Sequence, residues 1–579
     1  MEIKVFEYSD NGLNEVKSDS KGKNWPVVYL IHNDNALYIG ETTSAAVRMD
    51  QHLKNPEKQK ENLKTIEIIF DDTFNKSVIL DYEQKLIKYC KTDKNYENII
   101  NKNAGQSSTH DYYDRDHYNN YFRCIWAELI KHGVAKNSID IIENQNIFKY
   151  SPYNALTEEQ NEISVDIIKD ITQKLQNKEK GISLVDGCAG TGKTVLAISM
   201  INSLVNAINI DEDDLTEEDK STDKVKALLE LKRYIQLHQD LTIGFVFPMT
   251  GIRKTISTVF KECGNGLSVD MVLSPYDVRK KKYDVLFVDE SHRLCKRKNI
   301  MNFSTFDETC AALGMDKYTS NQLDWVLEQA QYTVLFYDKD QSIKGSDISY
   351  NEFQNSLYAP NIPVTNYFLT TQMRCQGGDS YIKYIKEIIN VKNPSFKNVD
   401  NYDFKIFDDV DVMVNKIKEL NKQYELCRNV AGYSWKWVTK PSKKNKFKTY
   451  EDIKLSGSYD IDINGNHYVW NVTTEDWISR EDSIDTIGCI HTTQGFDLNY
   501  VGVIFGEEID YNPVTNRIEV DLSKFYDKNV KNGTDEDTVK DYIINTYTTI
   551  MARGIRGCYV YACNDNLQNY LKQFIKEGE

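Results

Sequence analysis

The chain has 579 residues, of which 40% are hydrophobic and 27% charged, a composition typical of a globular protein with room for about three or four domains. A formal net charge of −16 argues against a uniformly basic nucleic-acid-binding surface, although a basic groove can lie on an acidic body. No apolar run reaches membrane-spanning length, the N-terminus lacks a signal-peptide pattern, and the 11 cysteines include no Cys-x-x-Cys pair. These patterns predict a cytoplasmic protein without a zinc ribbon or a disulfide framework.

Residues 1–24 are polar and predict no defined element. The next part of the chain has a β-β-α-β-α pattern. Strands are expected at 27–31, 36–40 and 65–70, and helices at 44–53 and 76–90. Glu83 lies beside the apolar stripe of the second helix rather than on its solvent-exposed face.

This pattern carries polar and aromatic residues that resemble the GIY-YIG nuclease family over about residues 25–105. The matching positions are Tyr29, Tyr38-Ile39-Gly40, Arg48, His52, Glu83 and an asparagine at 101 or 103. Phosphodiester hydrolysis needs an activated water, positive charge at the phosphate and a metal at the leaving oxygen. The resemblance implies that Tyr29 is the general base and that Arg48 clamps the phosphate. It further implies that Glu83 holds one divalent metal, with Tyr38 and His52 assisting. Val27 stands where the family has its first glycine, so binding without cleavage is the alternative.

A connector at 106–154 precedes a helix that begins near Thr157, an N-cap residue followed by acidic residues. Further on, residues 183–195 predict an apolar strand, a glycine-rich turn and the first turn of a helix. The phosphate-binding loop template is matched by Gly187, Gly190, Gly192, Lys193 and Thr194. In such a loop the backbone N–H groups and the lysine bind phosphates, and the Thr hydroxyl can ligate Mg²⁺. The sequence therefore predicts that this chain binds a nucleoside triphosphate.

Two further apolar segments, 284–293 and 333–343, end in polar residues. Asp289 and Glu290 follow the first, where we expect Asp289 on Mg²⁺ and Glu290 polarising the attacking water. Gln341 follows the second. Because ligands bind at the carboxyl ends of parallel strands, these side chains are predicted to line one crevice.

Residues 155–579 resemble superfamily 1 helicase-like ATPases, most of all the bacterial group related to the helicase part of long Schlafen proteins, which shares the sequence of 431–435. The resemblance implies two RecA-like lobes, about 155–345 and 346–579, with ATP between them. It also implies roles for single residues: adenine recognition by Gln160, γ-phosphate sensing by Gln341, catalytic charge from Arg374 (motif IV) and Arg553 (motif VI), and motif V at Thr493, Gln494 and Gly495.

An insertion near 431–480 places Trp435 and Trp437 ahead of a lysine-rich stretch. Aromatic faces can stack on bases while lysines follow phosphates, although a basic hairpin that faces water fits the pattern equally well. Thr250 and Thr493 are further nucleic-acid candidates by family position alone.

Together these features predict an α/β protein with a small GIY-YIG domain and two RecA-like lobes, acting as an ATP- and Mg²⁺-dependent nuclease and translocase on nucleic acid, DNA rather than RNA. The domain pairing suggests bacterial anti-phage defence or DNA repair, with a homo-oligomer or a defence-system partner left open. Two alternatives stay open: a remodeller whose GIY-YIG domain only binds, and a nucleotide-gated regulatory switch, which the acidic net charge favours.

Overall fold

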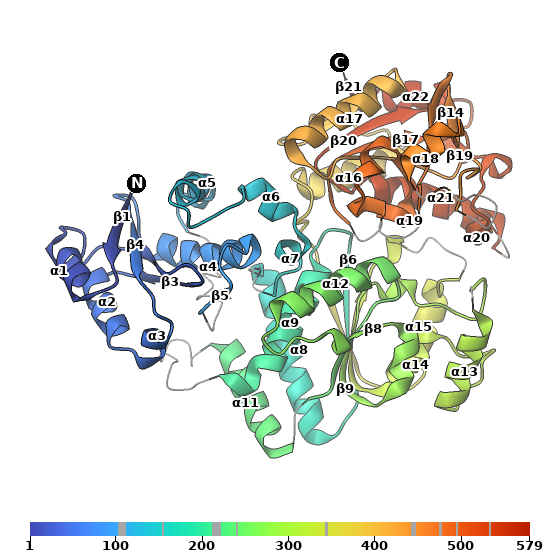
Figure 1. Ribbon diagram of the computed structural model, residues 1–579. Coiled ribbons are helices and arrows are strands. Elements are labelled where there is room, and N and C mark those ends of the chain that lie inside the picture. Colours follow the sequence, from blue (N-terminus) through green and yellow to red (C-terminus); the bar gives the residue numbers. More distant parts are fainter. Residues whose placement is uncertain are drawn as a thin grey trace. The chain divides into compact units, whose positions relative to one another are not determined.

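The computed structural model describes residues 1–579 except 102–111, 153, 155, 211–221, 239–240, 301, 342–345, 442–446, 448, 474–476, 494–495, 532–533 and 579. The chain divides into two compact units, Met1–Glu162 and Ile163–Glu579 (Figure 1). Within the described residues, no helix combines the length and apolar character needed to cross a membrane.

The first unit is built on a sheet with strand order β1-β4-β2-β3-β5. Its strands are β1 (Glu2–Glu7), β2 (Val27–His32), β3 (Ala36–Thr42), β4 (Thr65–Phe70) and β5 (Asn98–Ile99). β2 pairs antiparallel with both β3 and β4, and this register places Tyr29 opposite Gly40. Residues 1–24, for which no element was predicted, supply β1 and the helix α1 (Asp10–Ser18). β1 is an edge strand that pairs only with β4 in the described residues, and its exposed side chains explain its weak apolar pattern.

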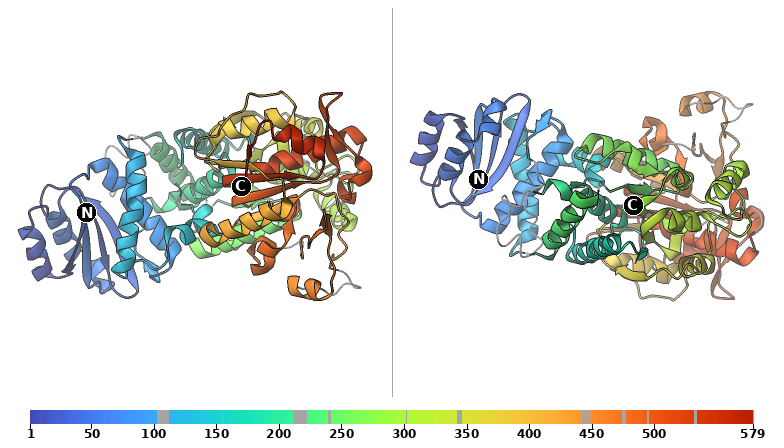
Figure 2. Two further views of the ribbon diagram at one scale, coloured as in Figure 1. Left: turned by 90° about the horizontal axis from the view of Figure 1, so that it is seen from above. Right: turned by 90° about the horizontal axis from the view of Figure 1, so that it is seen from below.

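Helices cover both faces of this sheet, as the two views in Figure 2 show. The helices after α1 are α2 (Ala45–Leu53), α3 (Pro56–Lys60), α4 (Lys76–Asp93), α5 (Arg115–Lys131), α6 (Ile139–Asn144) and α7 (Asn146–Lys149). α1 and α2 pack on the face that carries Tyr29, whereas α4 and α5 pack on the opposite face around Leu30 and Ile39. Val27 is fully buried on the Tyr29 face, so the departure from the family's glycine adds a core side chain without breaking the register.

The second unit begins with a parallel sheet of order β11-β6-β10-β9-β7-β8. Its strands are β6 (Gly181–Gly187), β7 (Ile243–Val246), β8 (Val272–Leu273), β9 (Tyr283–Val288), β10 (Ala330–Tyr337) and β11 (Val364–Leu369). The associated helices are α8 (Glu158–Asn177), α9 (Lys193–Asn206), α11 (Asp223–His238), α12 (Thr250–Cys263), α13 (Phe303–Leu313), α14 (Gln322–Gln329) and α15 (Tyr350–Tyr358). β11 pairs with β6, so this sheet continues past residue 345, where the sequence analysis began the second lobe. β11 was not predicted because many of its side chains are exposed, so its sequence lacks a clear apolar pattern.

A second parallel sheet follows, with order β16-β13-β17-β20-β12-β21. Its strands are β12 (Asp403–Ile406), β13 (Arg428–Ala431), β16 (Ile487–Gly488), β17 (Leu498–Phe505), β20 (Gly554–Ala562) and β21 (Lys576–Glu577). Its helices are α16 (Gly378–Ile389), α17 (Val410–Tyr424), α18 (Tyr450–Leu455), α19 (Ile490–Thr493), α20 (Lys528–Lys531), α21 (Glu536–Met551) and α22 (Asp565–Leu571). Two small hairpins, β14 (Ile461–Ile463) with β15 (Asn466–Tyr468) and β18 (Ile509–Asn512) with β19 (Arg517–Val520), extend from it.

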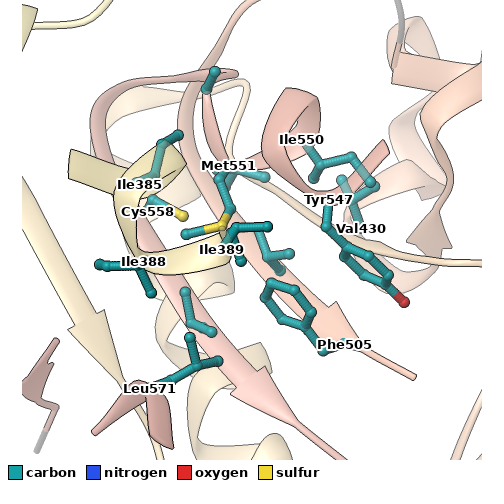
Figure 3. Close-up of a cluster of buried hydrophobic side chains, with 14 of the residues drawn as sticks. Ile385, Ile388, Ile389, Val430, Phe505, Tyr547, Ile550, Met551, Cys558 and Leu571 are labelled. Atoms are coloured by element: carbon teal, nitrogen blue, oxygen red, sulfur yellow. The ribbon is translucent and has the colours of Figure 1, made fainter. Parts of the chain in front are cut away.

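The core of this lobe forms between α16, α21 and the sheet (Figure 3). Ile385 and Ile389 of α16 and Met551 of α21 are at most 1% exposed, and they lie against Phe505 of β17. Burial of such side chains stabilises the lobe by roughly 1.5–3 kcal/mol each. The predicted fold class, a small mixed α/β domain followed by two parallel-sheet lobes, is confirmed.

Candidate functional site

The turn between β6 and α9 has the backbone of a phosphate-binding loop. Gly190 and Gly192 have φ of +89° and +78°, left-handed values that side chains other than glycine rarely adopt. A Cβ on Gly190 would lie 2.0 Å from Oε1 of Gln372, so the loop also needs glycine for space. Lys193, the first residue of α9, follows directly, and its N-terminal end is favourable for anions.

Lys193 and Thr194 already contact the neighbouring strands. Lys193 Nζ donates to the backbone oxygens of Gly187 and Cys188 and lies 3.5 Å from Oδ2 of Asp338, which follows β10. The Thr194 hydroxyl donates to Oδ2 of Asp289 over 2.6 Å. The carboxyl ends of β6, β9 and β10 therefore meet at one edge of the sheet, as the sequence predicted for a ligand crevice.

Asp289 is buried and Glu290 is largely buried, with 13% of its side chain exposed, yet they are held in different protonation states. Burial and the charge of Glu290 raise the pKa of Asp289 to about 6. Burial would raise the pKa of Glu290 too, but a hydrogen bond from His292 and the charges of His292, Lys193 and Arg553 hold it well below its usual value. Glu290 also has a left-handed φ of +50°, a strained conformation for a side chain of this size. Glu290 is thus kept ionised beside a carboxyl group that can be protonated.

The predicted sensor Gln341 and the predicted arginine Arg553 lie close to these strand ends. Gln341 is 4% exposed, donates its amide to Asp338 over 2.5 Å, and has an Oε1 without a hydrogen-bond partner among the described residues. Arg553 is 2% exposed and close enough for its charge to act on Glu290. Arg374 forms an ion pair with Asp497. The second lobe therefore brings a buried arginine close to Glu290 of the first.

The first unit holds a separate cluster centred on Tyr29. The ring of Tyr29 crosses Gly40, where a Cβ would lie 2.2 Å from the tyrosine oxygen. Tyr29 Oη lies 2.7 Å from Nε2 of His52 on α2, and the ring of Tyr38 lies 5.0 Å from the His52 ring. Burial raises the pKa of Tyr29 well above its usual value, while the charge and hydrogen bonding of Arg48 oppose that shift. The four predicted residues are therefore neighbours in space.

Glu83 on α4 approaches the same strand end from the other face of the sheet. Burial and the charge of Glu41 raise the pKa of Glu83 to about 7, opposed by Lys76, Arg48 and a hydrogen bond from the Glu41 backbone. Glu41 itself is bound by Lys76 at 2.5 and 2.6 Å. A carboxyl group held partly protonated by burial can release its proton to a divalent metal. Of the two predicted asparagines, Asn101 bonds both backbone groups of Ile39, and 103 lies outside the described residues.

Comparison with known proteins agrees with both predicted domains. The family model of the Schlafen group 3 DNA/RNA helicase domain matches residues 180–564, and that of the GIY-YIG catalytic domain matches residues 26–97. The chain belongs to the Schlafen group 3 DNA/RNA helicase domain family. Both resemblances noted in the sequence are thereby confirmed.

Among curated proteins, this Schlafen-family chain is similar to the uncharacterized protein YPL245W of Saccharomyces cerevisiae. The two are 27% identical over 430 residues, which is 68% of this chain and 84% of the yeast protein. Among solved structures, a DNA replication initiation factor aligns at 14% identity over 48% of this chain and 66% of that one, with a TM-score of 0.20. An arterivirus nonstructural protein 10 helicase in complex with DNA aligns at 11% identity over 69% of this chain and 65% of that one, with a TM-score of 0.23. The Pif1 helicase of Candida albicans aligns at 12% identity over 72% of this chain and 99% of that one, with a TM-score of 0.27. The alignments thus span slightly less than two thirds of the first two structures.

The remaining predicted residues of this Schlafen-family chain lie in different settings. Thr250 begins α12 and is exposed. Thr493 is fully buried, and its hydroxyl donates to the backbone oxygen of Cys489 over 2.9 Å. Trp435 and Trp437 pack as partly buried residues against a core cluster of the second lobe. Gln160 is 1% exposed and its side chain accepts from the Thr157 backbone over 3.1 Å, a helix-capping arrangement. Gln494, Gly495 and much of the lysine-rich stretch lie outside the described residues.

One residue at the phosphate loop was missed. Gln372 donates to the backbone oxygen of Ala189 over 2.6 Å, and the Met373 N–H donates to Gly190 over 2.9 Å. The segment that joins the two lobes is thereby bonded to the loop that would bind phosphate. The sequence feature that could have pointed to Gln372 is its position two residues before the predicted motif IV arginine, Arg374.

Proposed function

We propose that the chain is an ATP-driven motor on nucleic acid, coupled to a metal-dependent endonuclease. The observation that carries the proposal is that one chain holds two assembled sites. One is the phosphate loop with its carboxylates and a buried arginine, and the other is the Tyr29 cluster within the GIY-YIG domain. A domain kept only as a scaffold has no need of a glycine at position 40 to seat a tyrosine against a histidine.

In the motor, the groups supply what phosphoryl transfer needs. Lys193 leaves the backbone oxygens of Gly187 and Cys188 and turns to the phosphates of ATP. Ionised Glu290 accepts the proton of the attacking water, whose oxygen bonds to the γ-phosphorus as the bond to ADP breaks. Arg553 offers a planar, permanent charge to the transferring group. Arg374 and the Gln341 oxygen, which has no hydrogen-bond partner among the described residues, report the presence of that group to the second lobe.

Mg²⁺ fits the oxygen donors of both sites. The Thr194 hydroxyl and the Asp289 carboxylate would hold it in the motor, and Glu83 would hold it in the nuclease. When bound, the ion neutralises phosphate charge and stabilises the leaving oxygen. The raised pKa values of Asp289 and Glu83 mean that each site exchanges a proton for the metal.

In the nuclease, Tyr29 accepts the proton of the attacking water while that oxygen bonds to phosphorus and the bond to the leaving strand breaks. Arg48 stabilises the charge that develops on the phosphate oxygens. His52 and Tyr38 orient the base. We assign the substrate as DNA rather than RNA, with Thr250, Trp435 and Trp437 as contact candidates and Gln160 on the adenine. Thr493 is fully buried and is not retained as a contact. The defence or repair setting is a prediction from the domain pairing.

The experiment that tests this proposal measures cleavage and ATP hydrolysis by the full chain with single- and double-stranded DNA and RNA in Mg²⁺. The variants are Glu83→Gln and Lys193→Ala. We expect Glu83→Gln to lose cleavage by at least about 100-fold and keep nucleic-acid-stimulated ATPase, and Lys193→Ala to lose ATPase. Exposed residues provide matched controls, Glu97→Gln and Lys226→Ala, which should behave as wild type.

Each alternative has its own outcome. Wild type that never cuts but hydrolyses ATP in response to nucleic acid is a remodeller with a binding-only GIY-YIG domain. ATPase indifferent to nucleic acid, with no salt-dependent binding, identifies a nucleotide-gated switch and overturns the motor.

A further inference from the structure

A lysine outside the GIY-YIG motif residues lies within the nuclease site. Lys58, in the middle of α3, is 8% exposed. Its Nζ lies 2.6 Å from Nδ1 and 3.3 Å from Nε2 of His52, so Nδ1 is the nearer ring nitrogen, and 3.0 Å from the centre of the Tyr38 ring. Among the described side chains it has no carboxylate within ion-pair distance. A buried lysine that faces a histidine and a tyrosine, rather than an acid, calls for a reason other than charge pairing.

The surroundings of His52 and Lys58 set the protonation states of both side chains. Burial and the charges of Lys58 and Arg48 lower the pKa of His52 to about 2, so the ring is neutral at physiological pH and carries one proton. Burial and the charge of Arg48 lower the pKa of Lys58 to about 7. As an ammonium ion a lysine can only donate, and as a neutral amine it still has N–H groups to donate.

These contacts form a chain of hydrogen bonds. If Lys58 donates to Nδ1, the single ring proton of His52 must be on Nε2. That proton then points at the Tyr29 oxygen, 2.7 Å away. The Tyr29 oxygen becomes an acceptor, which favours its deprotonated form.

Resting on the nuclease part of the proposed function, we propose that Lys58 is a positioning residue: it fixes the His52 tautomer that donates to Tyr29 and thereby prepares Tyr29 to accept the proton of the attacking water. No other residue of the described part of the site donates to Nδ1 of His52. The lysine acts through the histidine and need not touch the substrate.

The groups that set the protonation of Tyr29 come from every element around it. Tyr38 faces it from β3, His52 and Arg48 from α2, and Glu83 acts on it from α4. Lys58, from α3, acts on Tyr29 through His52. Without the hydrogen bond donated by His52, the pKa of Tyr29 should rise and the rising limb of a rate–pH profile should move to higher pH.

The test uses the full chain with Lys58→Met, Lys58→Gln and Lys58→Arg. Met removes the donor and the charge, Gln keeps a donor without the charge, and Arg keeps both. Lys60→Met is the matched control, an exposed lysine of the same helix. The first readout is the tautomer of His52, from ¹⁵N NMR of histidine-labelled protein with the signal assigned by His52→Gln. The second is single-turnover cleavage at saturating DNA as a function of pH, alongside the DNA dissociation constant.

We expect wild type, Lys58→Gln and Lys58→Arg to keep the proton of His52 on Nε2, and Lys58→Met to lose this preference. Cleavage by Lys58→Met should fall by about 10- to 100-fold with unchanged DNA affinity. The rising limb should shift to higher pH in Lys58→Met, which loses the donor, and not in Lys58→Gln or Lys58→Arg, which keep it. A wild-type proton on Nδ1, or a Lys58→Met protein equal to Lys60→Met, overturns the proposal. If Glu83→Gln cuts as well as wild type, the proposed nuclease fails, and the NMR readout still decides the tautomer by itself.

Discussion

Asp289 and Glu290 are adjacent in the sequence, yet their surroundings move their pKa values in opposite directions. Glu290 has His292 3.0 Å away and the charges of Lys193 and Arg553 nearby, which favour its ionised form. Asp289 is buried beside the charge of Glu290, which favours its protonated form. His292, which the sequence did not point to, is thus one of the groups that separate the two pKa values.

The same reasoning gives a pH dependence for the nuclease. The pKa of Glu83 is raised to about 7, so below that pH a proton competes with the metal, and above it the carboxylate is free. We expect the Mg²⁺ concentration for half-maximal cleavage to rise about fivefold from pH 7 to pH 6 and to fall only about twofold from pH 7 to pH 8. Titration of Mg²⁺ at the three pH values measures this, with saturating Mg²⁺ as the control. A half-maximal concentration that is constant from pH 6 to pH 8 would contradict it.

At the scale of elements, the β2–β3 hairpin shows how register creates a site. The antiparallel register puts Gly40 directly opposite Tyr29, and the absence of a side chain on one strand leaves the space for the ring of the other. One residue of slippage would turn Tyr29 to the opposite face, away from His52 on α2.

Gly40→Ala tests this packing. The new methyl group would lie 2.2 Å from the Tyr29 oxygen, so we expect Tyr29 to be displaced, the first unit to lose about 1–3 kcal/mol of stability, and cleavage to fall at least tenfold. ATPase should be unchanged. Gly251→Ala is the matched control, since a Cβ there meets no atom within 4 Å. Thermal unfolding and single-turnover cleavage measure the two effects, and wild-type cleavage by Gly40→Ala would show that Tyr29 does not act from this position.

At the scale of the whole molecule, the two proposed catalytic sites lie in different compact units. The nuclease cluster is contained in Met1–Glu162, and the phosphate loop with its arginines in Ile163–Glu579. Each unit has hydrophobic clusters of its own, so each can unfold as its own cooperative transition.

Calorimetry of the full chain should therefore show two transitions. A non-hydrolysable ATP analogue with Mg²⁺, at about 100-fold excess over its dissociation constant, should raise only the transition of the second unit, by about 3 °C. Lys193→Ala should remove the shift, and Glu83→Gln should leave it intact. Equal shifts of both transitions would show that the units unfold together.

The sequence predicted the elements that local pattern controls. The strands β2, β3, β4, β6, β9 and β10 were expected from apolar runs because buried strands need them, and the phosphate loop from glycines because only they adopt its backbone. The edge strands β1 and β11 were not predicted, because they expose half or more of their side chains and their apolar pattern is therefore weak.

The candidate residues divide in the same way. The sequence by itself determined which side chains are available at the ends of strands, because spacing along one element fixes their direction. Only the tertiary structure decided which residues from distant elements join them: His292 on Glu290, Gln372 on the phosphate loop and Lys58 on His52. Those contacts depend on how helices and loops pack against the sheets, and burial, which packing alone creates, is what shifts the pKa values of the groups expected to do the chemistry.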